Sequence, residues 1–178
     1  MDQNVNVWKA NFTNGIILGL IGIVYTLVMY FLDLSFNRAQ GFIFVVIQVV
    51  VLFFLVKSYR DNFLHGSMTY GQALGAGMVI TLYYAIIVAV FYYILYAIID
   101  PELLNKQLVA SEEMMLKRGM SEAQIEAGRQ FQEKIMKPEI MAPFSIFGNM
   151  LWGLILSLII GIFVRKESNP LIDTPANQ

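Results

Sequence analysis

The sequence predicts an all-α integral membrane protein with four transmembrane helices and an amphipathic helical hairpin between the third and fourth spans. Hydrophobic residues make up 57% of the 178 residues and charged residues only 14%, against about 45–50% and 25% in soluble domains. The apolar residues are gathered in four blocks, about residues 12–32, 41–56, 70–99 and 144–164. About 20 apolar residues in a helix cross a bilayer. We therefore expect one four-helix membrane domain over residues 1–166.

The first span, residues 12–32, contains the GxxxG pair Gly15 and Gly19. Glycines four residues apart lie on one side of a helix and let a second helix approach closely. This surface could serve for dimerisation or could pack against another helix of the same chain, and we favour the second interpretation.

The second span, residues 41–56, is short and rich in valine. Valine favours strands in water, but a lone strand in a bilayer would leave backbone groups unpaired, so we expect a helix. Gln48, near its middle, could line a pore or form an interhelical hydrogen bond. A loop with four charged or titratable residues is expected over residues 57–69: Lys57, Arg60, Asp61 and His65.

The third span, residues 70–99, carries no charged side chain, and we expect the other helices to be arranged around it. Small residues recur at every fourth position along it: Ala73, Gly77, Thr81, Ala85 and Ala89. Such a row is typical of a helix that packs closely against another helix in a membrane. Tyrosines are expected on the opposite side: Tyr83, Tyr84, Tyr92, Tyr93 and Tyr96.

Residues 101–137 change abruptly to a charged and methionine-rich composition that predicts two amphipathic helices outside the membrane. The first helix should end at Gly119, a natural C-terminal glycine. The second should begin at Ser121, which forms a capping-box pattern with Gln124. Each helix has a narrow apolar row: Leu104, Leu108 and Met115 on the first, and Ala123, Ala127, Phe131 and Ile135 on the second.

The fourth span is predicted over residues 144–164, after a return to the bilayer bracketed by Pro138 and Pro143. Its small residues again recur at every fourth position: Gly153, Ser157 and Gly161. The tail, residues 167–178, contains two prolines and few apolar residues, so we expect it to be disordered.

Several local motifs accompany this pattern. They are Tyr70-Gly71-Gln72-Ala73-Leu74 at the start of the third span, Gly119-Met120-Ser121-Glu122-Ala123-Gln124-Ile125-Glu126 in the hairpin, and Pro143-Phe144 and Arg165-Lys166 at the ends of the last span. With them, the chain resembles the uncharacterised four-span proteins of domain of unknown function 4199 over roughly residues 10 to 166. The resemblance implies a bacterial inner-membrane protein of unassigned activity, and it brings no functional residues that could be transferred.

Composition excludes several kinds of site. The chain has no cysteine and one histidine, which excludes disulfides, thiolate nucleophiles and multi-histidine metal centres. Its net charge of −1 gives no reason to expect nucleic-acid binding. The carboxylates of the hairpin have the spacing of a solvated helix surface, so we expect no enzymatic activity, catalytic residues, cofactor or metal.

Transporters and channels normally carry ionisable groups inside their spans, and the four predicted spans have none. A small transporter or channel component for a neutral solute, using Gln48, Thr81 and Asn149, is the alternative that remains. By elimination, the sequence favours an accessory, scaffold or assembly protein whose hairpin binds a partner. The expected contact residues are Leu104, Leu108, Met115, Phe131 and Ile135, and the bilayer, a second copy of the chain or another membrane protein could cover them.

The distribution of basic residues predicts the orientation in the membrane. One side of the spans is flanked by Lys9, Lys57, Arg60, Arg165 and Lys166, whereas the first loop offers only Arg38 on the other. The long loop that holds the hairpin adds six Lys and Arg residues, together with eight acids, to that other side. Cytoplasmic loops are enriched in Lys and Arg. We therefore expect both termini in the cytoplasm and the hairpin on the opposite side.

Overall fold

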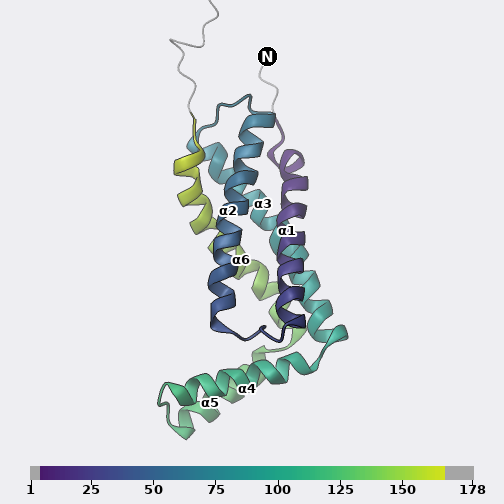
Figure 1. Cartoon of the computed structure of the whole chain (residues 1–178), viewed down its shortest axis with the longest axis vertical. Helices are drawn as coiled ribbons and strands as arrows, with labels where there is room; N and C mark the ends of the chain where they lie inside the picture. The colour runs from purple at the N-terminus through teal and green to yellow at the C-terminus, as the bar shows by residue number, and fades with distance from the viewer. Residues whose placement is uncertain (1–4, 167–178) are drawn as a thin grey trace, which may run out of the picture.

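The computed structural model describes residues 5–166, and it confirms an all-helical membrane protein (Figure 1). The helices are α1 (Val7–Phe31), α2 (Arg38–Phe63), α3 (Tyr70–Ile94), α4 (Glu102–Lys117), α5 (Glu122–Ile135) and α6 (Pro138–Val164). A short π-helix, η1 (Leu95–Ile99), continues α3. Four helices are long and apolar enough to cross a membrane: α1, α2, α3 with η1, and α6. The predicted disordered tail lies outside the described residues.

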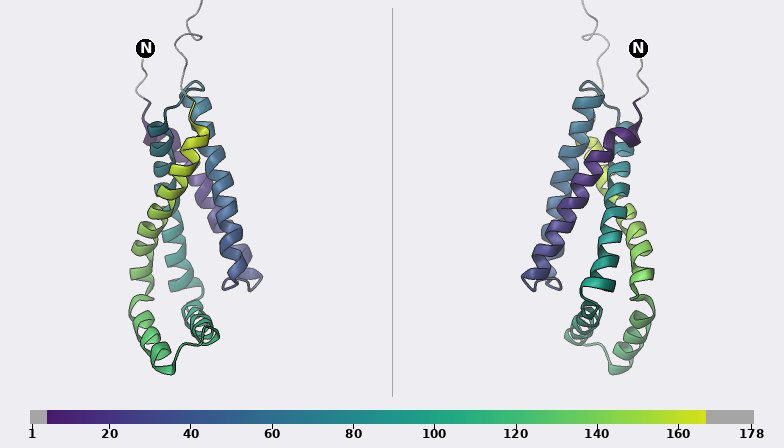
Figure 2. Two further views of the ribbon diagram at one scale, coloured as in Figure 1. Left: turned by 90° about the vertical axis from the view of Figure 1, so that its left-hand side faces the viewer. Right: turned by 90° about the vertical axis from the view of Figure 1, so that its right-hand side faces the viewer.

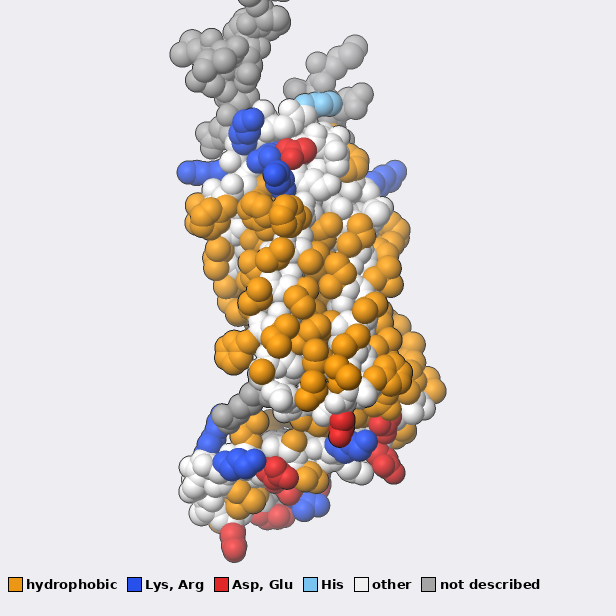
Figure 3. Space-filling model, viewed as in Figure 1, with side chains coloured by type: hydrophobic (Ala, Val, Ile, Leu, Met, Phe, Trp, Pro, Cys, Tyr) orange, Lys and Arg blue, Asp and Glu red, His pale blue; other side chains and the backbone are white. Residues whose placement is uncertain are grey.

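The hairpin and the chain ends lie at opposite ends of the bundle. α1 begins and α6 ends at one end, while α4 and α5 lie across the bundle axis at the other (Figure 1). Figure 3 shows an apolar middle on the face it displays, with charged side chains gathered near the termini and on the hairpin. This distribution is that of a multi-pass membrane protein with a polar extramembrane hairpin.

The third span is the centre of the bundle, as the sequence predicts. α3 packs against α1, α2 and α6, and four of its side chains are fully shielded from solvent: Ala76, Ile80, Thr81 and Ala85. Toward the hairpin, α1 and α2 lean away from α6, and α3 and α6 also diverge (Figure 2).

The predicted start of the loop at residue 57 is wrong, because α2 continues to Phe63. Buried side chains continue past the first charged residue, Lys57. Four of them are at most 8% exposed: Leu52, Leu55, Val56 and Tyr59. Arg60 then reaches the end of α6, where its Nη1 donates a hydrogen bond of 3.0 Å to the carbonyl oxygen of Val164. The end of the apolar run therefore marks the edge of the span and not the end of the helix.

The fourth span is predicted from residue 144, but the helix that carries it, α6, begins six residues earlier at Pro138. Proline suits the first position of a helix, where its missing N–H would have no partner. Pro143 lies inside the helix, in the second turn, where its ring removes one backbone donor. Pro138 therefore begins α6 and Pro143 lies within it, so the two prolines do not mark the ends of a non-helical linker.

Candidate functional site

The glycines and small side chains of α3 and α6 fit into one another. A Cβ atom at Gly77 would lie 2.8 Å from Cβ of Ser157, and one at Gly153 would lie 2.7 Å from Cβ of Thr81. Where the start of α3 meets the end of α6, a Cβ atom at Gly161 would lie 3.0 Å from Cε2 of Tyr70. Each glycine thus provides the space that the opposite side chain fills. We call this contact the glycine seam.

The GxxxG pair of α1 lies against α3 of the same chain. A Cβ atom at Gly15 would collide with Tyr83, and one at Gly19 would lie 2.9 Å from Cγ2 of Ile87. The surface that could have served for dimerisation is therefore occupied within the chain.

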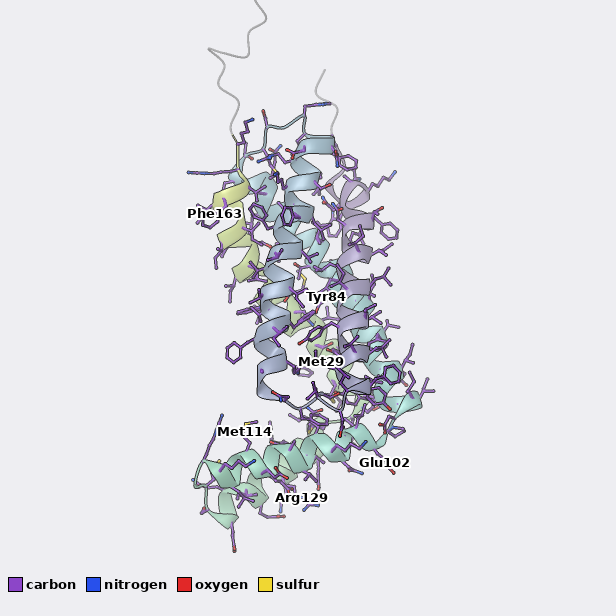
Figure 4. The ribbon with its side chains drawn as sticks, in the orientation of Figure 1. Met29, Tyr84, Glu102, Met114, Arg129 and Phe163 are labelled. Atoms are coloured by element: carbon purple, nitrogen blue, oxygen red, sulfur yellow. The ribbon has the colours of Figure 1, made fainter. Side chains whose placement is uncertain are left out.

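The tyrosines of α3 are not all on the outer side. Tyr84 is 3% exposed and stacks on Phe44 of α2, with ring centroids 6.4 Å apart, so its predicted place opposite the small row is wrong. Figure 4 shows Tyr84 inside the bundle and Phe163 pointing outward from α6. Tyr84 is buried because it stands next to buried Ala85 on the inner side of α3. Its ring lies over Gly22 of α1, where the missing side chain leaves room for it.

The contact between α3 and α6 has two halves. In the closed half, small side chains let the helices pack tightly, and in the open half the tyrosines leave a space. Ala85 and Ala89 are still buried, at 0% and 2% exposure. Beyond them, Tyr92, Tyr93 and Tyr96 face the start of α6 across a hollow of about 250 Å³. We call this the tyrosine hollow. Large side chains thus hold the two helices apart at the end that bears the hairpin.

Asp100 joins the hairpin to the spans. Its Oδ1 accepts a hydrogen bond of 3.1 Å from the backbone N–H of Glu102, which caps α4. Its Oδ2 accepts a hydrogen bond of 3.2 Å from the Tyr30 hydroxyl of α1 and lies 3.6 Å from Nζ of Lys106. Leu103, next to it, is 4% exposed. One carboxylate therefore fixes the angle at which α4 leaves the bundle.

The two hairpin helices are held together by polar contacts and one close packing point. Gln132 Nε2 donates a hydrogen bond of 2.8 Å to Ser111 Oγ, and Arg129 Nε lies 3.5 Å from Oε1 of Glu112. Arg129 also donates to Glu133 at 2.9 Å, and this bond, with the charge of Glu112, raises the pKa of Arg129. The guanidinium therefore stays protonated, so Arg129 keeps the charge that joins α5 to α4.

The predicted contact residues of the hairpin differ in exposure. Met115 lies inside the hairpin, since a Cβ atom at Gly128 would be 3.0 Å from its Cε. Leu104 and Leu108 are half-buried. Phe131 and Ile135 are exposed, at 63% and 41%, and so are the other two members of their row, Ala123 and Ala127. We call Ala123, Ala127, Phe131 and Ile135 of α5 the exposed row.

The predicted capping box at Ser121, at the start of α5, is confirmed.

The polar side chains of the spans differ in burial and in hydrogen bonding. Gln48 is 2% exposed, and its Nε2 has no hydrogen-bond partner among the described residues. Asn149 donates to the carbonyl oxygen of Ser145 in its own helix at 2.7 Å. Sequence reasoning missed Asn11, which is fully buried and accepts a hydrogen bond of 3.0 Å from Asn14. Two asparagines three residues apart in an apolar helix were the available signal.

Within residues 5–166, no group of three His, Cys, Asp or Glu side chains could hold a metal ion. A family model described as "Protein of unknown function (DUF4199)" matches residues 13–166. No curated protein and no solved structure has significant similarity to the chain.

Proposed function

The chain belongs to the protein family of unknown function DUF4199, and from this premise we propose that it is a non-catalytic accessory or assembly subunit of a membrane complex. The hairpin is the part that binds the partner. The observation that carries the proposal is the exposed row of α5, which lies on a capped helix held by ion pairs and is left uncovered by the rest of the described chain.

The shape of the exposed row favours a helix of another membrane protein as the occupant. Ala123, Ala127, Phe131 and Ile135 recur at every fourth position, which is the pattern of a helix that is recognised along one side. The two alanines admit a close neighbour, and Phe131 supplies one large anchor. A helix that lies on a bilayer generally presents a broader apolar face with basic residues beside it. This row is narrow, and the residues along one side of it are Glu126, Gln130 and Lys134, which together carry no net charge.

The alternative, a transporter for a neutral solute, is less well supported by the geometry. Thr81 lies against Gly153 in the glycine seam, and buried Ala85 and Ala89 lie between that seam and the tyrosine hollow. A solute that entered the hollow would meet packed helices. Solute uptake by vesicles that contain only this protein would favour the alternative.

Photo-crosslinking in cells tests the partner proposal. A photoreactive residue at Phe131 should give an adduct with a different membrane protein, and the same residue at Leu116, 60% exposed on α4, should not. Ala127→Arg should abolish the adduct formed at position 131 without changing the amount of folded protein. Adducts with only a second copy of the chain or with lipid would contradict the proposal.

We place the protein in a bacterial inner membrane with both termini in the cytoplasm, because five basic residues lie near the end where α1 begins and α6 ends. Since the chain has no cysteine, single variants Leu116→Cys and Ser168→Cys can be labelled separately. An impermeant maleimide added to intact spheroplasts should label position 116, which is exposed on α4, and not position 168. The reverse result would invert the orientation.

A further inference from the structure

A second hollow lies in the corner between α4, α5 and the first turns of α6. Its volume is about 500 Å³, within the range of about 300–1,000 Å³ that is usual for small-molecule sites. Most of its lining is apolar: Phe131, Ile135, Met136, Ile140, Met141 and Phe144. We call it the corner hollow.

Three uncharged polar residues form one end of the corner hollow: Gln107, Ser111 and Gln132. Gln132 Nε2 donates to Ser111 Oγ at 2.8 Å, so these two side chains satisfy each other in part. Gln107 Oε1 is different, because it is shielded from solvent and has no hydrogen-bond partner among the described residues. An acceptor left in this state costs free energy until a donor reaches it.

We propose that the corner hollow binds a neutral lipid with a free hydroxyl group, of the diacylglycerol class. The hydroxyl donates to Gln107 Oε1, and the acyl chains lie along Ile135, Ile140 and Phe144. The site goes beyond the partner contact proposed above and does not rest on it, because α4, α5 and α6 of one chain form all of its walls. Phe131 and Ile135 belong to both surfaces, so a bound lipid would lie beside the partner helix.

The charge of the lining selects a neutral headgroup. None of the residues around the corner hollow is acidic or basic, and a charge placed in an apolar site needs a partner of opposite sign. Arg129, the basic residue of the hairpin closest to Phe131 in the sequence, is paired with Glu112 and Glu133. A phospholipid headgroup would therefore find no partner for its phosphate within the hollow.

The position of the hollow makes the bilayer the source of the ligand. Phe144 forms one wall and is 72% exposed, and Phe147, one turn further along α6, is 64% exposed. These side chains continue from the hollow onto the apolar outer surface of a predicted span. A lipid can thus leave its hydroxyl at Gln107 while its chains remain among the bilayer lipids.

Photolabelling of the full chain in phosphatidylcholine vesicles tests the proposal. The probe is a diacylglycerol with a diazirine in one acyl chain, and its competitors are unlabelled diacylglycerol and the same lipid with its hydroxyl acetylated. Labelling should concentrate on α5 and the start of α6, and the free hydroxyl should compete about tenfold better, as expected for about one net hydrogen bond.

Gln107→Leu should remove this preference for the hydroxyl while the protein stays folded, because it deletes an acceptor that has no partner within residues 5–166. Gln130→Leu is the matched control, since Gln130 is exposed on α5 and outside the hollow, and it should keep the preference. Ile135→Trp should reduce labelling at the corner by filling it. Equal competition by both lipids, labelling spread evenly over the spans, or an unchanged preference in Gln107→Leu would each overturn the proposal.

Discussion

The half of α3 near the chain termini and the half near the hairpin meet α6 through different kinds of side chain. In the glycine seam, every glycine faces a side chain that occupies its missing Cβ position. In the open half, Tyr92, Tyr93 and Tyr96 leave a hollow in front of α6. Because packed interiors tolerate little added volume, the first half should hold the fold together. The second half has space that can accept change.

Filling the glycine seam should give the largest effect. Gly77→Leu would force its Cβ to within 2.8 Å of Ser157 Cβ and add three further carbons. We expect a loss of about 3 kcal/mol or more in the free energy of unfolding, at the upper end of overpacking costs. Gly161→Leu should act in the same direction. Thermal unfolding in detergent measures both.

Val50→Leu is the control for these variants, because Val50 is 49% exposed on α2. It adds apolar volume to the outer surface of a span and should leave the unfolding temperature unchanged. If the glycine variants were as stable as Val50→Leu, the seam would not be a close contact.

Substituting Asp100, which joins the hairpin to the spans, should cause the second-largest loss of stability. Asp100→Ala removes the cap of α4 and the bond to Tyr30, and we expect a loss of about 1–2 kcal/mol, mostly from the cap. The exposed pair with Lys106 should contribute little. Faster amide hydrogen exchange in α4 and α5, with unchanged exchange in α3, is the expected signature. Uniformly faster exchange in all helices would contradict a local role for Asp100.

The sequence predicts the four spans and the small rows because both depend on composition and on the period of a helix. It does not predict where α2 ends, since the apolar run stops at Val56 while the helix continues through buried Tyr59. The apolar run ends where the surroundings change from lipid to water, but the helix does not need to end there. Nor does it predict the π-helix of residues 95–99, because that turn depends on how the chain leaves the span.

The candidate sites divide in the same way. Phe131 and Ile135 could be named from the period of α5, and they are exposed. Met115 belongs to the same prediction but packs on Gly128 inside the hairpin, because an apolar row does not indicate which helix covers it. The corner hollow could not be found from the sequence, since Gln107 and Phe144 are brought together by the angle between α4 and α6.

Adding volume to the open half should have a small effect, which makes the comparison with Gly77→Leu direct. Ala142 lines the tyrosine hollow of about 250 Å³, and Ala142→Leu adds three carbons to that space. We expect the free energy of unfolding to change by no more than about 0.5 kcal/mol, as for substitutions that neither create a clash nor a cavity. A loss as large as that of Gly77→Leu would mean that the two halves are equally packed.

The smallest effect is expected from Ser157→Ala, in the middle of the glycine seam. Ser157 is 1% exposed, and its Oγ has no hydrogen-bond partner among the described residues. Removing a buried hydroxyl that pairs with nothing should be nearly neutral, or stabilising by less than about 0.5 kcal/mol. Ser157→Val keeps the hydroxyl absent but adds volume toward Gly77, and it should destabilise by about 1–3 kcal/mol. The pair of variants separates size from polarity at one position: if Ser157→Ala were the more harmful, the seam would depend on a hydrogen bond and not on the fit of small side chains.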